Sequence, residues 1–131
     1  MIILDTHILL WWLLSGGKLT AKQKQALSEV SPGNPACVCT ITLWEVAMLH
    51  AKGRIELPCS LREFLELATA PPLVKRQEVT PEIAAVVYEL IDTFHGDPAD
   101  RIIVATAKAL GASLMTVDEK IIASSIVPIC R

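Results

Sequence analysis

Four acidic residues stand next to the ends of predicted strands or the starts of predicted helices. Asp5 and Asp118 each follow a short apolar segment, and Glu45 and Asp100 lie in the predicted first turns of two helices. A buried carboxylate cluster is costly unless a cation neutralises it. All-oxygen ligation is the preference of Mg²⁺ or Mn²⁺ rather than zinc. Such a site suits phosphodiester hydrolysis, in which the ion activates a water molecule and stabilises the leaving oxygen.

Each of these residues also has a purely structural explanation. Asp5 could cap the helix that follows it, and Thr42-x-x-Glu45 has the spacing of a capping box. Asp97 precedes a proline and is the expected N-cap of the next helix. There, Asp97 and Asp100 would each stabilise the helix by roughly 0.3–1 kcal/mol. Capping explains each residue separately. It does not explain why four acidic residues, without a matching set of cations, would all lie at one edge of the sheet that the order of elements predicts.

The elements that position these residues alternate along the chain. Buried-strand patterns are expected at residues 2–4, 36–41, 73–79, 113–117 and 126–129. Helices are expected at residues 8–14, 21–30, 43–53, 61–69, 81–93, 98–110 and 120–124. This alternation predicts an α/β fold in which a central parallel sheet lies between layers of helices. Right-handed crossovers would bring the carboxyl ends of all the strands, and the acidic residues with them, to one edge.

Composition limits the functional classes. The chain has 131 residues, of which 52% are hydrophobic and 20% charged, and its net charge is −2. These values predict one folded domain and exclude disorder. No overall basic field indicates nucleic acid, so any such contact would use a local patch. No basic region precedes the first apolar stretch, and no run approaches the roughly 18 apolar residues of a membrane span. We therefore expect a cytoplasmic protein without a membrane segment.

The cysteines and histidines show no metal-ligand spacing. Cys37, Cys39, Cys59 and Cys130 form no CxxC pair, so reduced structural thiols are favoured over zinc or disulfides. Cys37 and Cys39 are two residues apart, so their side chains are expected on the same face of a predicted strand. The histidines are His7, His50 and His95. His7 and His95 flank acidic residues and could contact substrate, although structural histidines are the commoner case.

Five motifs, in their order and spacing, resemble the PIN-domain proteins, and more closely the VapC-type toxins of bacterial toxin–antitoxin pairs. They are Ile3-Leu4-Asp5-Thr6-His7, Thr42-x-Trp44-Glu45, Gly53-Arg54-Ile55-x-Leu57-Pro58, Asp97-Pro98-x-Asp100-Arg101 and Thr116-x-Asp118. The resemblance runs from residue 2 to about residue 122. It implies that residues 1–131 form a single PIN domain, a three-layer sandwich, with the activity of a Mg²⁺- or Mn²⁺-dependent endoribonuclease.

The resemblance also implies roles for individual residues. The acidic site of the family falls on Asp5, Glu45, Asp100 and Asp118 of this chain, which would be both catalytic residues and metal ligands. Asp97 matches the third acidic position less well than Asp100 does, so it either caps the helix or supports the site. At the neighbouring positions, hydroxyl groups would orient metal-bound water or substrate; these are Thr6 and Thr116.

Partners follow from the same resemblance: an RNA substrate, a cognate antitoxin that blocks the site, and a second copy of the chain in a homodimer. The apolar run Ile8 to Leu14 fits such interfaces. A small chain has little surface for reading RNA sequence, so recognition is expected to use RNA shape and a basic groove. The candidates for contacts with the RNA backbone are Lys18, Lys52, Arg54 and Arg101.

Three other functions are compatible with parts of the pattern. A phosphatase could use Asp5 as a nucleophile, but that class requires a second aspartate two residues on, where His7 stands. A non-catalytic PIN-like binding module could use the carboxylates only to cap helices and hold a structural ion. A DNA nuclease of the same fold would act on branched DNA, but this chain lacks an inserted arch or clamp segment. The ribonuclease is favoured over all three.

Overall fold

A five-stranded parallel sheet forms the centre of the protein, in the strand order β3-β2-β1-β4-β5. The computed structural model describes residues 1–15, 17–94 and 96–130. The strands are β1 (Ile2–Leu4), β2 (Ala36–Cys39), β3 (Val74–Gln77), β4 (Ser113–Met115) and β5 (Ile129–Cys130). The predicted parallel sheet is therefore confirmed.

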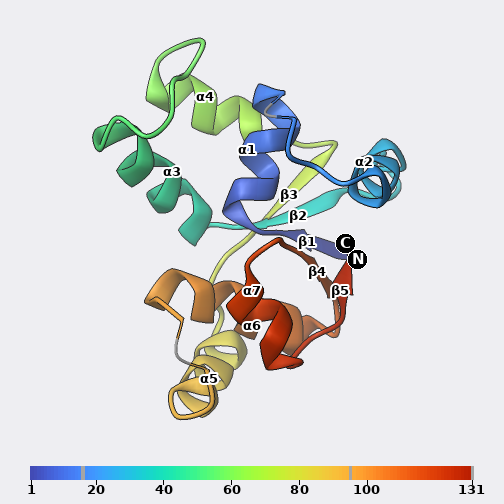
Figure 1. Ribbon diagram of the computed structural model, residues 1–131, viewed down its shortest axis with the longest axis vertical. Helices are drawn as coiled ribbons and strands as arrows, with labels where there is room; N and C mark the ends of the chain where they lie inside the picture. Colours follow the sequence, from blue (N-terminus) through green and yellow to red (C-terminus); the bar gives the residue numbers. More distant parts are fainter. Residues whose placement is uncertain (16, 95, 131) are drawn as a thin grey trace.

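Helices cover both faces of this sheet. They are α1 (Thr6–Leu14), α2 (Ala21–Ser28), α3 (Ile41–Ala51), α4 (Leu61–Ala68), α5 (Pro81–Leu90), α6 (Pro98–Leu110) and α7 (Glu119–Ser124). Figure 1 shows α1 to α4 on one side of the sheet and α5 to α7 on the other. The predicted three-layer sandwich is confirmed. Among the described residues, no helix combines the length and apolar character that a membrane crossing requires.

Alternation along the strands divides the core between the two faces. Ile3 and Leu114 pack with the buried residues of α5 and α6, while Leu4 and Met115 pack with those of α1 and α2. Cys37 and Cys39 share the first of these faces, as their spacing predicts. A separate apolar cluster joins α1, α3 and α4 through residues that include Leu10, Val46 and Phe64.

Local signals fix α6, the helix that carries two of the predicted site residues. The Asp97 side chain accepts a hydrogen bond from the backbone N–H of Asp100 at 2.9 Å, and Pro98 occupies the first helical position. At the other end, Gly111 adopts a left-handed conformation with φ of 61° and caps the helix. The predicted bounds of this helix, and its N-cap, are confirmed.

The predicted capping box of α3 is wrong. The strand before it ends at Cys39, two residues earlier than expected, and the helix begins at Ile41 with Thr40 as its N-cap. Thr42 and Glu45 therefore lie inside the helix, and Glu45 is beyond its first turn. The side chains of both residues hydrogen-bond to Thr6, which is distant in sequence, instead of closing a box with each other.

Other element boundaries also differ from expectation: α2 ends at Ser28 rather than at residue 30, β3 is Val74–Gln77 rather than residues 73–79, and α5 ends at Leu90 rather than at residue 93. The first helix begins at Thr6 rather than at residue 8, because Asp5 caps it through the Thr6 N–H. β4 ends at Met115, so two residues separate it from Asp118. The last strand is Ile129–Cys130 rather than residues 126–129. The apolar character of Ile126 reflects packing on the core rather than strand pairing.

Candidate metal centre

All five acidic residues singled out in the sequence line one cleft of about 330 Å³. Asp5 follows β1 and Asp118 lies in the connection after β4, so the parallel topology brings them to the same edge of the sheet. Glu45 comes from α3, and Asp97 and Asp100 come from the start of α6. The structure therefore brings these carboxylates together in one cleft, as the sequence predicts.

Three of the carboxylates approach one another most closely. Glu45, Asp97 and Asp100 each offer an oxygen atom within 4.8 Å of the other two. Asp5 and Asp118 line the same cleft but do not belong to this group of three. Asp97, which is expected either to cap the helix or to support the site, caps α6 and also contributes an oxygen atom to the group.

Asp118 has a structural task as well. Its Oδ1 accepts hydrogen bonds from the backbone N–H groups of Lys120 at 2.8 Å and Ile121 at 3.3 Å, so it is the N-cap of α7. Because both donors use Oδ1, the cap leaves Oδ2 available to other partners.

Buried threonine hydroxyl groups hold two of the carboxylates. The Thr116 hydroxyl donates to Asp5 Oδ2 at 2.6 Å and accepts from the backbone N–H of Asp118 at 3.0 Å. The Thr6 hydroxyl donates to Glu45 Oε1 at 2.5 Å. Since that uses its single proton, Thr42 donates in the 3.0 Å contact between the two threonine hydroxyl groups. The expected role of Thr6 and Thr116 in orienting water stays a prediction, but their contacts with the carboxylates are direct.

The cleft disfavours negative charge. Burial raises the pKa of Asp5, although the hydrogen bonds from Thr116 and from the Thr6 N–H oppose this effect. Burial also raises the pKa of Glu45, against the hydrogen bond from Thr6. Burial together with the neighbouring carboxylates, Asp97 first among them, raises the pKa of Asp100 to about 7. This cluster would gain from a bound cation.

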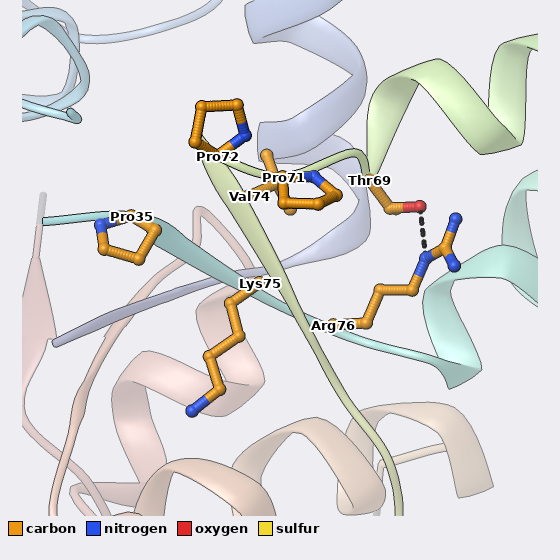
Figure 2. A pocket seen from close by; sticks show the side chains of 7 residues that line it. All are labelled: Pro35, Thr69, Pro71, Pro72, Val74, Lys75 and Arg76. Carbon is orange, nitrogen blue, oxygen red and sulfur yellow. Dashed lines mark hydrogen bonds between the residues drawn. The ribbon is translucent and has the colours of Figure 1, made fainter. Parts of the chain in front are cut away.

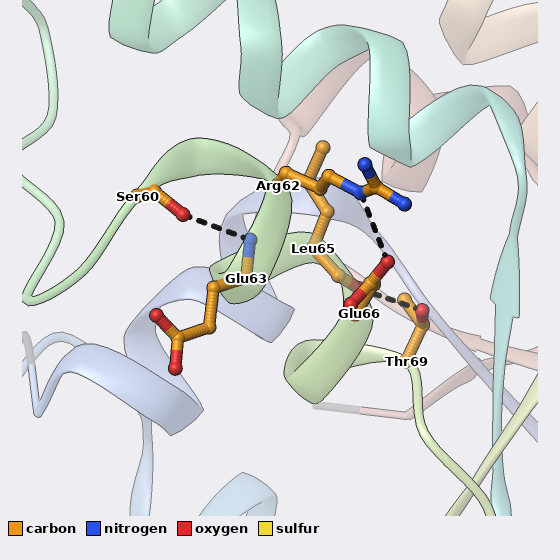
Figure 3. A network of polar contacts seen from close by, with 6 residues as sticks. All are labelled: Ser60, Arg62, Glu63, Leu65, Glu66 and Thr69. Carbon is orange, nitrogen blue, oxygen red and sulfur yellow. Dashed lines mark hydrogen bonds and ion pairs between the residues drawn. The ribbon is translucent and has the colours of Figure 1, made fainter.

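In the part of the chain that the structure describes, lysine and arginine side chains do not supply that cation. Among the described residues, the one ion pair is Arg62–Glu66 on the surface of α4, with 3.2 Å between Nε and Oε1 (Figure 3). Lys and Arg are also absent from the described residues that line the cleft. An all-oxygen donor set, with Asp5 buried and Glu45 and Asp100 partly buried, and with no lysine or arginine in its described lining, fits a divalent metal ion.

The other predicted contact residues divide into two groups. His7 lines the cleft, and its ring lies 6.0 Å from that of Trp11, which also lines it. Arg101 is not among the lining residues; its Nε donates to the carbonyl of Phe94 at 3.1 Å. Its predicted contact with substrate stays a prediction. His50 lies in the last turn of α3, outside the cleft lining, and His95 lies outside the described residues.

Trp11 and Val117 line the cleft but were not singled out from the sequence. The spacing of His7 and Trp11, four residues apart on α1, is a signal that could have found the first of them, because such residues share one helix face. Lys18 lies 5.8 Å above the Trp11 ring, which brings one of the predicted RNA contacts close to the cleft.

Cavity volume alone does not identify the site. A cavity of about 420 Å³ lies beside the edge strand β3, lined by prolines and by Lys75 and Arg76 (Figure 2). Arg76 Nε donates there to the Thr69 hydroxyl at 2.7 Å. No carboxylate belongs to its described lining, so it lacks the chemistry of a metal site.

The thiols offer no alternative centre. All four cysteines are free, as expected. Burial raises the pKa of Cys39 to about 12, which suppresses the thiolate form that metal binding or nucleophilic attack requires. Cys37 is also buried, and burial raises its pKa as well.

Comparison with known proteins places the chain in a family. The PIN domain model matches residues 2–124. Ribonuclease VapC22 of Mycobacterium tuberculosis is 32% identical over 120 residues, which are 92% of this chain and 88% of that protein.

Solved structures share the fold across nearly the whole chain. VapBC-1 from nontypeable Haemophilus influenzae has a TM-score of 0.73 and 19% identity, covering 98% of this chain and 96% of that one. VapBC2 from Rickettsia felis, bound to a DNA fragment from its promoter, has a TM-score of 0.71 and 16% identity, covering 98% and 97%. The family match and the identity to a VapC protein show that this chain is a VapC-type member of the PIN-domain family.

Proposed function

We propose that this protein is a metal-dependent endoribonuclease that hydrolyses RNA phosphodiester bonds and acts as the toxin of a toxin–antitoxin pair. The observation that carries the proposal is the group formed by Glu45, Asp97 and Asp100, whose carboxylate oxygens lie within 4.8 Å of one another. Asp5 and Asp118 line the same cleft. The relative with 32% identity is named as a ribonuclease, which supports RNA as the substrate.

The proposed metal is Mg²⁺, with Mn²⁺ as an alternative. Glu45, Asp97, Asp100 and Asp5 would hold it, with Asp118 at the edge of the cleft. A bound divalent ion lowers the pKa of a water molecule and stabilises the charge that develops on phosphate oxygens. Carboxylate ligands that leave room for water and phosphate are typical of magnesium sites in phosphate chemistry.

The chain's own residues prepare the cleft for this chemistry. Thr116 fixes Asp5, and Thr6 fixes Glu45, so these two carboxylates keep their positions in the absence of metal. Asp100, with a pKa of about 7, holds a proton for part of the time at neutral pH and loses it when a cation binds. His7 and Trp11 present aromatic rings at the cleft wall, where an RNA base could stack.

We further propose that residues 1–131 act as one PIN unit, pair with a second copy and are inhibited by a cognate antitoxin. Supporting this, the structural relatives are named as VapBC complexes, and large apolar side chains are exposed, including Trp44 at 56% and Leu67 at 67%. RNA and an antitoxin would both be met in the cytoplasm, which we propose as the compartment.

The test is cleavage of a mixed RNA pool by the purified protein with Mg²⁺, with Mn²⁺ and with a chelator, beside single-stranded and branched DNA. We expect metal-dependent cutting of RNA and none with the chelator. Cutting of branched DNA alone would identify a DNA nuclease of the same fold. Metal binding without cutting of any nucleic acid would identify a binding module.

A further inference from the structure

A lysine side chain lies over an aromatic ring at the wall of the acidic cleft. Lys18 Nζ is 5.8 Å from the centroid of the Trp11 ring, and Trp11 lines the cleft together with His7 and Asp5. Lys18 is exposed and lies outside the described lining of the cleft. Trp11 therefore borders both the acidic cleft and an exposed ammonium group.

The contact between Lys18 and Trp11 is weak. Within residues 1–15, 17–94 and 96–130 the one ion pair is Arg62–Glu66, so the Lys18 ammonium group forms none there. A cation over an exposed aromatic ring gains little free energy, and a lysine side chain is long and flexible. Lys18 therefore occupies the face of the Trp11 ring in a way that a stronger ligand can displace.

The Trp11 ring, by contrast, is held in place. It is partly buried and packs against the apolar cluster that includes Leu4 and Leu27. The His7 ring is tilted by 55° to it at a centroid distance of 6.0 Å, so His7 does not stack flat on the indole. A fixed indole ring with one face under a displaceable side chain is a platform on which another flat ring can stack.

The pair fits a ligand that combines a flat ring with negative charge. Stacking of a nucleobase on an aromatic side chain is stronger than a cation–π contact at an exposed site, so a base would displace Lys18 from the ring. The displaced ammonium group stays beside the ligand, where it can neutralise a phosphate. Every base has a π-face, so the contact accepts any base, but that base must be unstacked, as in single-stranded RNA.

We propose that Trp11 and Lys18 form a nucleotide subsite beside the acidic cleft, in which an RNA base replaces the ammonium group on the indole face and Lys18 moves to a phosphate of the same strand. The inference rests on the proposed ribonuclease function, because the cleft that Trp11 lines would hold the scissile phosphate. The subsite makes an unpaired nucleotide beside the cut a requirement for rapid cleavage. It selects for strand state rather than for sequence.

The first test is a double-mutant cycle between Trp11 and the base. An RNA that wild type cuts at a single site is prepared with an abasic nucleotide at each flanking position in turn. We expect the abasic nucleotide at one position to lower the kcat/KM of wild type about tenfold. Trp11→Leu should lower kcat/KM on the intact RNA by a similar factor and show no further loss with the abasic nucleotide.

Two more variants separate stacking from packing. Trp11→Phe keeps an aromatic face, so it should retain most of the kcat/KM of wild type and its sensitivity to the abasic nucleotide. Trp44→Leu, a matched change at an exposed tryptophan of α3, should behave like wild type. Each variant must show the circular dichroism spectrum of wild type. A loss from the abasic nucleotide that is as large in folded Trp11→Leu as in wild type would overturn the stacking contact.

A second readout does not depend on cleavage. The indole N–H signal of Trp11, identified by its absence in Trp11→Phe, is followed by NMR in chelator while adenosine or the dinucleotide ApA is added. Adenosine carries no charge, so the carboxylates of the cleft do not repel it. We expect both probes to shift the Trp11 signal and to leave the Trp44 signal in place.

Lys18→Gln tests the exchange of occupants on the ring. Adenosine no longer competes with the ammonium group in this variant, so its affinity should rise about twofold to fivefold. ApA loses a phosphate contact, so the ratio of ApA affinity to adenosine affinity should fall. Lys22→Gln, the same change at an exposed position of α2, should keep the ratio of wild type. An unchanged ratio in Lys18→Gln would overturn the exchange.

The two readouts distinguish the subsite from the ribonuclease. A shift of the Trp11 signal by both probes, without RNA cleavage in Mg²⁺ or Mn²⁺, would support the subsite and refute the ribonuclease. RNA cleavage with no shift of the Trp11 signal and no effect of abasic nucleotides would refute the subsite alone.

Discussion

Replacing Asp100 with asparagine is expected to stabilise the metal-free protein and to weaken its response to metal. The pKa of Asp100 in the folded protein is about 7, against an ordinary value of 3.8, because burial and the neighbouring carboxylates disfavour its charged form. That difference corresponds to roughly 4 kcal/mol at full strength. Solvent screening of this partly exposed group reduces it to about 2 kcal/mol.

The sign follows from proton binding. Between the unfolded and folded pKa values the native state binds more protons at Asp100 than the unfolded state does. The stability of the wild-type protein without metal therefore falls as the pH rises through the window from about 4 to about 7. Asparagine cannot ionise, so the variant lacks this fall. It also loses a favourable charge in the first turn of α6, which offsets about 0.5 kcal/mol.

The assay is urea unfolding in chelator of wild type, Asp100→Asn and Asp92→Asn, an exposed control outside the cleft. At about pH 8, Asp100→Asn should be more stable than wild type by about 1–2 kcal/mol, and at about pH 5 by less than half of that. Saturating Mn²⁺ should then stabilise wild type more than the variant. A less stable Asp100→Asn at pH 8 without metal, or an equal gain in Asp92→Asn, would show that the charge of Asp100 does not destabilise the metal-free protein.

Three further predictions concern Thr6, Asp97 and the basic residues Lys52 and Arg54. Thr6→Val removes the hydrogen-bond donor to Glu45, so it should lower the free energy of unfolding by about 1–2 kcal/mol and slow RNA cleavage. Thr6→Ser keeps the hydroxyl group and should keep the stability and the cleavage rate of wild type, as measured by urea unfolding and a cleavage assay. Asp97→Ala should lower the free energy of unfolding by about 1 kcal/mol because the N-cap of α6 is lost, whereas Asp97→Asn keeps the cap. An equal loss of Mn²⁺ affinity in both variants would show that the Asp97 carboxylate contributes to metal binding independently of capping. RNA binding should weaken with added salt, and replacing Lys52 and Arg54 with glutamine should reduce the logarithmic slope by about 1–2; a flat response contradicts it.

Where local chemistry decides the structure, the sequence predicts it well. Neighbouring residues alone determine where the helix after Asp97 begins and ends: an aspartate is the N-cap, a proline is at the first position and a glycine is at the C-terminal end. The position of Asp5 after a buried strand follows from the same kind of evidence. Parallel topology then brings these acidic residues together without any further information from the sequence.

Where partners are distant in sequence, the pattern is misleading. Thr42 and Glu45 have the spacing of a capping box, but Thr6, 36 and 39 positions away, engages both of their side chains. The apolar residues before β5 indicate a strand, yet Ile126 packs on the core, and among the described residues β5 pairs with β4 through Ile129 and Cys130. The buried Gln23 side chain, whose Nε2 has no hydrogen-bond partner within the described part of the chain, is likewise apparent only from the structure.

We propose that the acidic cleft is a divalent metal site at which RNA is cleaved. Mn²⁺ binding and RNA cleavage should be measured on the same preparations of wild type, Asp5→Asn, Asp100→Asn and the control Asp92→Asn, each shown to be folded. Wild type and the control should bind Mn²⁺ and cut RNA, and both cleft variants should lose cleavage with weakened binding. Unaltered metal-dependent cleavage in both cleft variants would show that Asp5 and Asp100 do not form the site that cleaves RNA.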